Sequence, residues 1–158
     1  DSAEIEELPL GAMLGNAIEA YADIWRDRHF VFKPLPVEVS VLGSPELIIQ
    51  MLDKLVDNAV EFSQPADTIT VSAETLVDTV AISISNPGPP LPQNMRKELF
   101  DSMVSIRTSE SDKHLGLGLY IARIVAEGYG GSITANDTED GVRFTVTFPT
   151  KNTESTAT

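Results

Sequence analysis

Two stretches of the chain carry apolar residues at the three- and four-residue spacing of an amphipathic helix. The first runs from Leu10 to about Arg28, with apolar residues at positions 10, 13, 14, 17, 18, 21, 24 and 25. The second begins after Ser44 and Pro45, because a serine caps free amides and the fixed φ of proline suits a first turn. It continues to Ser63. The pattern therefore predicts two helices, each with one apolar face.

Short runs with period-two alternation predict the strands. Residues 29–33 and 37–43 are set off by prolines, and one of these two strands suits a sheet edge. Residues 68–85 alternate strictly around Val77 and Asp78, which predicts a hairpin. The face expected to be buried consists of Ile69, Val71, Ala73, Val80, Ile82 and Ile84. A second hairpin is predicted from residues 132–136 and 142–148.

A proline-rich break, a long polar connection and a third helix separate the two hairpins. The break is NPGPPLP, and residues 93–114 show only weak helical periodicity. A connection of this length inside a compact domain is usually functional or mobile. A helix is predicted to begin at the LGLGL of residues 115–119 and to end at the GYGG of residues 128–131. This order of elements predicts an α+β two-layer sandwich, with helices on one face of a mixed β-sheet.

Composition narrows the class of protein. The 158 residues suit one domain over residues 1–149, with a polar C-terminal tail over residues 150–158. With 24 acidic and 11 basic residues the net charge is -13, so we expect no nucleic-acid partner. The absence of cysteine excludes disulfides and thiolate zinc, and we expect no direct membrane contact because no apolar run reaches the ~20 residues of a membrane helix. The N-terminus has no signal-peptide pattern and is expected to be the cut edge of a longer protein.

Three local features are candidates for chemistry. Asn58 lies in a polar stripe with Gln50, Lys54 and Glu61. Asparagine is a poor mid-helix residue, so Asn58 is either a tolerated surface residue or one placed for coordination, and taken alone the surface interpretation is favoured. NPGPPLP taken alone suits a proline-stiffened turn. LGLGL fits equally an anion site of free helix amides or a helix packed closely through its glycines.

Taken together in chain order, four segments resemble the N, G1, F and G2 boxes of the GHKL ATPases, and specifically the catalytic ATP-binding domain of sensor histidine kinases. The segments are LDKLVDNAVEF, ISISNPGPPLP, ELFDSMVSIR and HLGLGLYIARIVAEGYGG. The resemblance covers most of the chain, from about Leu8 to Pro149. It implies the Bergerat fold, in which the nucleotide lies between helices and a flexible lid over one side of a mixed sheet.

The resemblance implies ATP and Mg²⁺ as ligands and gives roles to particular residues. Asn58 is expected to bind the Mg²⁺ that bridges the phosphates, as a neutral oxygen ligand. Lys54 lies on the same helix face and is expected either to contact phosphate or to neutralise Glu61. Asn86 and Gly88, in the G1 stretch, are expected to receive the adenine.

The remaining implied residues lie in the F box, the lid and the G2 box. Phe100 belongs to the F box, and residues 93–114 become the ATP lid, from which Arg107 or Lys113 is expected to reach the phosphates. The backbone amides around the G2 glycines are expected to hold the phosphates. Those amides belong to Gly116, Leu117, Gly118 and Leu119.

The sequence departs from the family pattern close to the expected ligand. Asn86 stands where an aspartate usually accepts a hydrogen bond from the adenine amino group, and it keeps a neutral acceptor oxygen. Pro90 and His114 replace glycines of the G1 and G2 boxes. Glu61 stands where Lys or Arg commonly reaches toward phosphate. Lys54 replaces the glutamate that activates water in gyrase-like and chaperone relatives, which favours phosphoryl transfer to a protein over hydrolysis.

The resemblance therefore predicts the catalytic fragment of a protein histidine kinase in a two-component system. Neither His29 nor His114 fits the phosphoacceptor, so the γ-phosphate is expected to go to a histidine on a separate dimerisation domain of the same kinase. The predicted downstream partner is a response regulator. The parent is expected to be anchored in the bacterial inner membrane, with this domain in the cytoplasm. Two alternatives stay open, namely a degenerate GHKL domain that acts as a protein-interaction module and an anti-sigma-type serine kinase.

Overall fold

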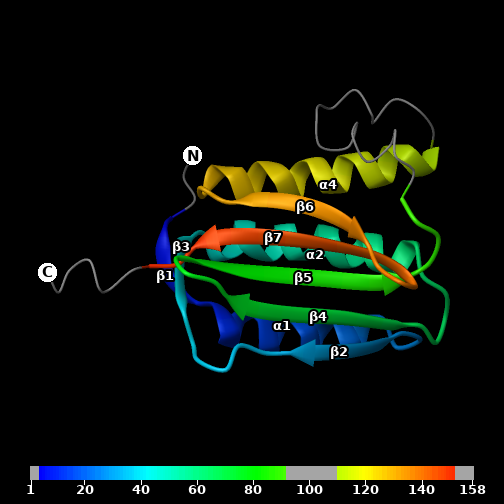
Figure 1. Ribbon diagram of the computed structural model, residues 1–158, viewed down its shortest axis with the longest axis horizontal. Helices are drawn as coiled ribbons and strands as arrows, with labels where there is room; N and C mark the ends of the chain where they lie inside the picture. The colour runs from blue at the N-terminus through cyan, green and yellow to red at the C-terminus, as the bar shows by residue number, and fades with distance from the viewer. Residues whose placement is uncertain (1–3, 92–109, 152–158) are drawn as a thin grey trace, which may run out of the picture.

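A computed structural model describes residues 4–91 and 110–151, which form two layers, one of strands and one of helices (Figure 1). The helices are α1 (Leu10–Ile24), α2 (Pro45–Glu61) and α4 (Glu110–Gly128). The strands are β1 (Glu6–Pro9), β2 (His29–Lys33), β3 (Ser40–Gly43), β4 (Thr68–Thr75), β5 (Thr79–Pro87), β6 (Ser132–Asp137) and β7 (Gly141–Pro149). The predicted α+β class is confirmed.

The main sheet is mixed, as predicted. Its strands follow the order β2-β4-β5-β7-β6, while β1 and β3 pair in a separate two-stranded sheet. Strands β2 and β4 are parallel, and the other neighbouring pairs are antiparallel. The β4–β5 hairpin turns at Val77 and Asp78, where Leu76 N donates to Thr79 O at 2.8 Å. Strand β2 lies at an edge, which confirms the prediction for one of the two early strands.

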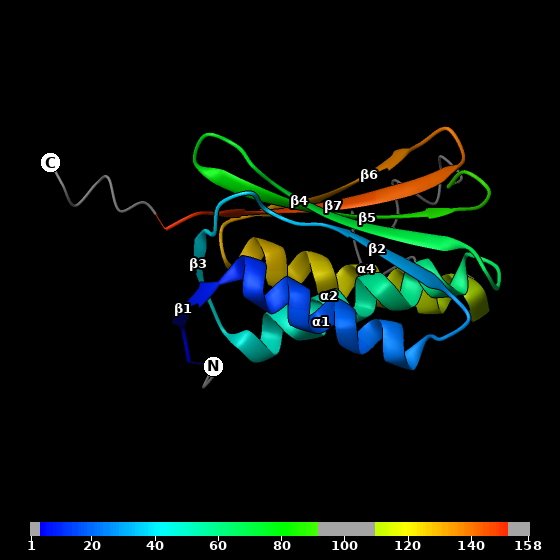
Figure 2. The ribbon, with the colours of Figure 1, turned by 90° about the horizontal axis from the view of Figure 1, so that it is seen from below.

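One face of the main sheet is apolar, and the three helices cover it (Figure 2). All the residues expected on that face are buried: Ile69, Val71, Ala73, Val80, Ile82 and Ile84. The opposite face is rich in Ser and Thr, which hydrogen-bond across strands, as where Ser83 Oγ and Thr145 Oγ1 lie 2.9 Å apart. Because successive side chains of a strand point to opposite faces, this alternation decides which side the helices cover.

Helix α2 forms where the sequence predicts it, and side chains hold its beginning. Ser44 Oγ accepts a hydrogen bond from Leu47 N at 3.3 Å, and Pro45 occupies the first turn. Ser44 N donates to Tyr129 Oη at 2.9 Å, which ties the start of α2 to the residue that follows α4. The buried apolar face of α2 consists of Ile48, Met51, Leu52, Leu55, Val56, Ala59 and Val60.

Helix α1 ends at Ile24 rather than near Arg28. Its first turn receives a cap from another segment, because the Glu38 carboxylate accepts hydrogen bonds from Gly11 N at 2.6 Å and Ala12 N at 3.0 Å. A negative charge also suits the positive end of a helix dipole. Tyr21 Oη donates to Asp53 Oδ1 at 2.6 Å, which joins α1 to α2.

Other boundaries also differ from the sequence prediction. Strand β1 has no predicted counterpart, and β3 covers only Ser40–Gly43 of the predicted 37–43. Helix α4 begins at Glu110 rather than at Leu115, so residues 110–114 of the predicted lid are helical. These five residues, ESDKH, include no apolar residue, and apolar periodicity therefore gives no sign of a helix there. The rest of the predicted lid lies outside the described residues.

The end of the described chain is attached to the domain. Thr150 N donates to Asp78 O at 3.1 Å, and Lys151 N donates to Ser40 O at 2.7 Å. Residues 152–158 of the predicted tail lie outside the described residues. In the two described ranges, no helix combines the length and apolar character needed to cross a membrane.

Candidate nucleotide site

Asn58 is buried, although its place in a polar stripe favours a surface position. The residue is 4% exposed. Its Nδ2 atom is also buried and has no hydrogen-bond partner among the described residues. A buried polar group left without a partner costs about 1–3 kcal/mol, so each such group in a folded protein calls for an explanation, and a ligand is one. The surface interpretation is wrong, and Asn58 is a candidate ligand-binding residue.

Gly118 of α4 keeps the space beside Asn58 free of side chain. A β-carbon at position 118 would lie 3.8 Å from Asn58 Oδ1, 3.8 Å from Lys54 Cβ and 3.9 Å from Lys54 O. Helices α2 and α4 therefore approach each other closely at this point, and a large side chain at position 118 would cover the amide. We call Lys54, Asn58 and Gly118 the α2–α4 cluster.

Among the residues whose side chains the structure describes, the charges beside the cluster belong to α2. Lys54 is partly buried, whereas Asp53 and Asp57 are more exposed to solvent. The pKa of Asp57 is raised, first because partial burial removes water from the carboxylate and further because Asp53 is negative; the charge of Lys54 opposes both effects. Lys54 thus interacts electrostatically with Asp57. Its predicted interaction with Glu61, which is exposed at the end of α2, stays a prediction.

Asn86 and Gly88 lie at the end of β5 and in the turn that follows it. Asn86 is 6% exposed, and its side-chain Nδ2 donates to Pro87 O at 2.9 Å. This bond identifies Nδ2 as the donor of the side chain, and Oδ1 is its hydrogen-bond acceptor. Gly88 has a φ of +145°, and a β-carbon there would lie 2.7 Å from Phe62 O, so only glycine fits. Gly88 N donates to Asp140 O at 2.9 Å.

The end of α2 connects these two groups of residues. Phe62 N donates to Asn58 O at 3.0 Å, and Phe62 O is the atom that Gly88 approaches. The structure therefore brings Lys54, Asn58 and Gly118 together and sets the turn at Gly88 against the end of the same helix.

The G2 residues occupy a different part of their helix from the one predicted. Gly116, Leu117, Gly118 and Leu119 lie inside α4, which begins at Glu110. Beyond the first four residues, helical N–H groups bond to carbonyls of the preceding turn. The prediction that these four amides form a free helix N-terminus is therefore wrong. Leu119 is 0% exposed and belongs to the core.

Other predicted residues fall outside the described ranges or on the surface. Phe100 and Arg107 lie outside the described residues, so their roles stay predictions. His114 lies within α4 rather than at a hinge before it. Pro90 is exposed, and His29 is exposed at the start of β2, as expected for a surface residue.

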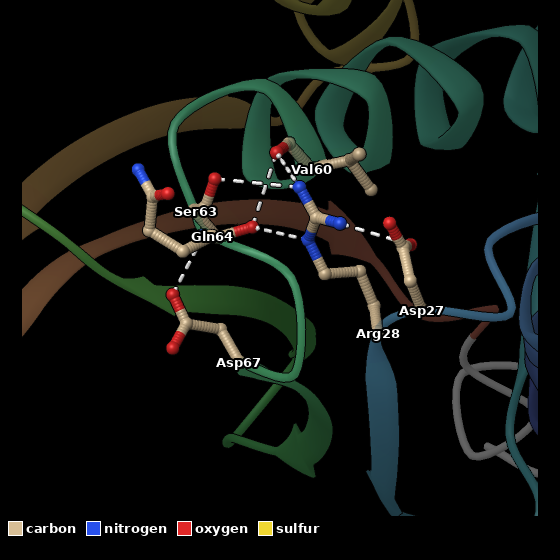
Figure 3. Close-up of polar contacts among 6 residues, drawn as sticks. All are labelled: Asp27, Arg28, Val60, Ser63, Gln64 and Asp67. Carbon is tan, nitrogen blue, oxygen red and sulfur yellow. Dashed lines mark hydrogen bonds and ion pairs between the residues drawn. The ribbon is translucent and has the colours of Figure 1, made fainter.

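Sequence reasoning missed several residues that shape these positions. A β-carbon at Gly141 would overlap Asn86 O, and Asp140 O accepts the hydrogen bond from Gly88 N. In the sequence, this Asp-Gly pair indicates only a hairpin turn. Arg28 binds the end of α2 (Figure 3). No local signal links Arg28 to residues 32 and 35 positions away along the chain.

Known proteins share this sequence pattern and fold. The family described as "Histidine kinase-, DNA gyrase B-, and HSP90-like ATPase" matches residues 43–152. Sensor protein CreC of Escherichia coli strain K12 is 31% identical over 106 residues, which are 67% of this chain and 22% of CreC. A nucleotide-free structure of the catalytic domain of histidine kinase ThkA is 27% identical with a TM-score of 0.79, covering 92% of this chain and 95% of that domain. ThkA in complex with response regulator TrrA matches at 25% identity and a TM-score of 0.78, covering 93% of this chain and 42% of the ThkA chain.

The chain belongs to the family of histidine kinase-, DNA gyrase B- and HSP90-like ATPases. Within this family its fold is that of the ATP-binding catalytic domain of sensor histidine kinases, as predicted. The chain spans 22% of the length of CreC and 31% of that of sensor histidine kinase CusS of Escherichia coli strain K12. It thus corresponds to one domain of those longer proteins.

Proposed function

We propose that this domain binds Mg-ATP at the end of α2 and donates the γ-phosphate to a histidine on a separate dimerisation domain of the same kinase. The observation that supports this most is the buried Nδ2 of Asn58, which has no hydrogen-bond partner among the described residues, while Oδ1 of the same side chain lies beside Gly118. We assign the phosphates to the side of the α2–α4 cluster and the G2 residues, and the adenine to Asn86 and Gly88.

Asn58 fits a magnesium ion bound together with a nucleotide. Its Oδ1 is a neutral oxygen of the kind that a hard cation binds, and its Nδ2 is a donor suited to a phosphate oxygen. Mg²⁺ usually keeps several waters and takes one or two protein ligands besides phosphates, so one side chain from this domain suffices. When bound, the ion would neutralise charge on the phosphate oxygens.

The adenine end uses a neutral acceptor. The bond from Asn86 Nδ2 to Pro87 O orients the side chain, so that Oδ1 is available to accept a hydrogen bond from the adenine amino group. An uncharged acceptor forms a weaker bond than the aspartate usual in the family. Phe100 and Arg107 are assigned by resemblance to the lid side of the nucleotide.

Lys54 favours transfer of the phosphoryl group to a protein over hydrolysis of ATP. It occupies the position at which gyrase-like and chaperone relatives carry a glutamate that activates water, and a lysine ammonium has no acceptor with which to take a proton from water. We therefore propose a histidine as the phosphate acceptor. The complex of ThkA with TrrA supports a response regulator as the downstream partner. We also propose a membrane-anchored parent that holds this domain in the cytoplasm, because the relatives are named as sensor proteins.

Isothermal titration of the folded domain with Mg-ATP and Mg-ADP tests nucleotide binding. Binding of both is expected, and no heat with either would overturn the proposal and favour a protein-interaction module. Incubation of the full-length kinase with γ-labelled ATP tests the transfer. Label that is stable to alkali and lost in acid is expected for phosphohistidine, whereas acid-stable label would indicate a serine kinase.

A further inference from the structure

We infer that Arg28 is a positioning residue for the nucleotide site, because it fixes the chain segment on which Asn58 and Gly88 both depend. This inference rests on the proposed function. Arg28 lies in the loop between α1 and β2, and its side chain is only 9% exposed. A guanidinium so well buried is expected to satisfy its donors with defined partners.

The guanidinium group binds the end of α2 with a set of hydrogen bonds (Figure 3). Its Nε donates to Ser63 Oγ at 2.9 Å, and its Nη2 donates to Val60 O at 3.0 Å and Ser63 O at 3.3 Å. Ser63 Oγ in turn donates to Val60 O at 3.1 Å. The last carbonyls of a helix lack intrahelical donors, so Arg28 and Ser63 provide them at this end. Arg28 is therefore a helix cap supplied by a distant segment.

Both the charge and the shape of the Arg28 side chain suit this position. The C-terminal end of a helix carries a partial negative charge, yet the last turn of α2 contains no basic residue and includes Glu61. Arg28 supplies the missing cation. Asp27 Oδ1 lies 2.9 Å from Arg28 Nη1 and holds the remaining side of the guanidinium. Because the bonds diverge from a planar fork, a lysine could replace the charge but not the full set of contacts.

The segment that Arg28 holds, residues 60–63, touches both parts of the proposed site. Phe62, in its middle, bonds through its N–H to Asn58 O at 3.0 Å. Its carbonyl oxygen lies against Gly88, so closely that a β-carbon on the glycine would be only 2.7 Å from it. A shift of this segment would loosen the helical turn that begins at Asn58 and move the surface on which Gly88 rests. Arg28 thus acts on both the phosphate side and the adenine side through the backbone.

The test compares nucleotide affinity with stability in four proteins: wild type, Arg28→Met, Arg28→Lys and the control Arg26→Met. Arg26 is exposed in the same loop, so its variant removes the same charge without removing the cap. Dissociation constants for Mg-ADP and a non-hydrolysable Mg-ATP analogue are measured at a temperature at which circular dichroism shows every variant to be folded. Unfolding temperatures are measured separately.

We expect Arg28→Met to raise both dissociation constants about 3- to 10-fold. Arg28→Lys should give a smaller rise because it keeps the charge, and Arg26→Met should bind like wild type. Unchanged affinity in folded Arg28→Met, with only a lower unfolding temperature, would overturn the inference and leave Arg28 a stabilising cap. If Arg28→Met does not fold, Arg28→Lys and Ser63→Ala decide by the same criteria.

A second readout does not require nucleotide. In the amide NMR spectrum of the nucleotide-free domain, Arg28→Met is expected to shift the resonances of Asn58 and Gly88, whereas Arg26→Met should leave them in place. Unmoved resonances would contradict the inference. If wild type itself binds neither nucleotide, the proposed function fails, and the positioning role fails with it. If wild type binds nucleotide and Arg28→Met binds equally well, only the positioning role fails.

Discussion

Gly118 of α4 faces Asn58 of α2 so closely that a β-carbon on the glycine would lie 3.8 Å from Asn58 Oδ1. That distance is an ordinary van der Waals contact, so a methyl group fits, whereas a longer side chain would extend over the amide. Alanine would also fit here and is the better helix former, so the contact itself excludes only larger side chains. We propose that the absence of a larger side chain at position 118 keeps Asn58 accessible to a ligand.

Two substitutions at Gly118 should separate stability from binding. Gly118→Ala is expected to raise the free energy of unfolding by about 0.5–1 kcal/mol, because alanine is the better helix former, and to leave Mg-ATP binding close to wild type. Gly118→Leu is expected to weaken Mg-ATP binding about tenfold or more, which corresponds to at least ~1.4 kcal/mol. Urea denaturation and isothermal titration measure the two quantities. Wild-type affinity in a folded Gly118→Leu would contradict this account of the cluster.

Ala66 has a backbone conformation that favours glycine. It has a φ of +76° in the turn that follows Pro65, closed by a hydrogen bond from Asp67 N to Gln64 O at 3.0 Å. Proline followed by a positive φ defines a type II turn, in which glycine is preferred at this position. Ala66→Gly is expected to stabilise the domain by about 0.5–1 kcal/mol, since relief of backbone strain exceeds the added chain entropy.

The control for Ala66→Gly is the same substitution in a helix. Ala20 is exposed in α1, and Ala20→Gly is expected to destabilise the domain by about 1 kcal/mol. Urea denaturation at neutral pH measures both variants. Destabilisation by both substitutions would show that the turn at Ala66 is not strained.

Tyr21 should make stability fall at alkaline pH. Its pKa is raised, first by burial and then by the hydrogen bond to Asp53 and the charges of Asp53 and Asp57. An unfolded tyrosine loses its proton near pH ~10, whereas folded Tyr21 keeps it. The folded state therefore binds more protons above that pH, and stability is expected to decline as pH rises from about 10 upward.

The variant Tyr21→Phe tests the source of this decline. It is expected to cost about 1 kcal/mol at pH 7, because the hydrogen bond to Asp53 is lost, and to make the decline above pH ~10 shallower. Urea midpoints at a series of pH values measure the slope. An equally steep decline in Tyr21→Phe would show that other groups cause it.

The sequence pattern predicted an element correctly where all the residues that define the element lie in one segment. Ser44 with Pro45 marked the start of α2, and the alternation around Val77 and Asp78 marked the hairpin and its buried face. The beginning of α4 carried no such signal, because ESDKH offers no apolar periodicity. Strand β1 was missed because it has four residues, of which only Leu8 is buried.

The site was predictable only where the family motifs named its residues. The spacing of Asn58 alone favoured a surface position, and its burial depends on the packing of α4 against α2, which local pattern does not contain. The contact of Arg28 with Val60 and Ser63 likewise joins segments far apart along the chain. Such contacts depend on tertiary packing, which periodicity within a single helix or strand does not report.

The proposed nucleotide site depends on Asn58, which is assigned to bind the magnesium of a bound nucleotide. Isothermal titration with ATP, in Mg²⁺ and in EDTA, tests this assignment in three proteins: wild type, Asn58→Ala and the exposed control Asn16→Ala. We predict that EDTA weakens binding to wild type and Asn16→Ala about tenfold or more, and that Asn58→Ala binds weakly in both conditions while remaining at least as stable. Wild-type affinity that is indifferent to EDTA, or an Asn58→Ala variant that binds Mg-ATP like wild type, would contradict the claim.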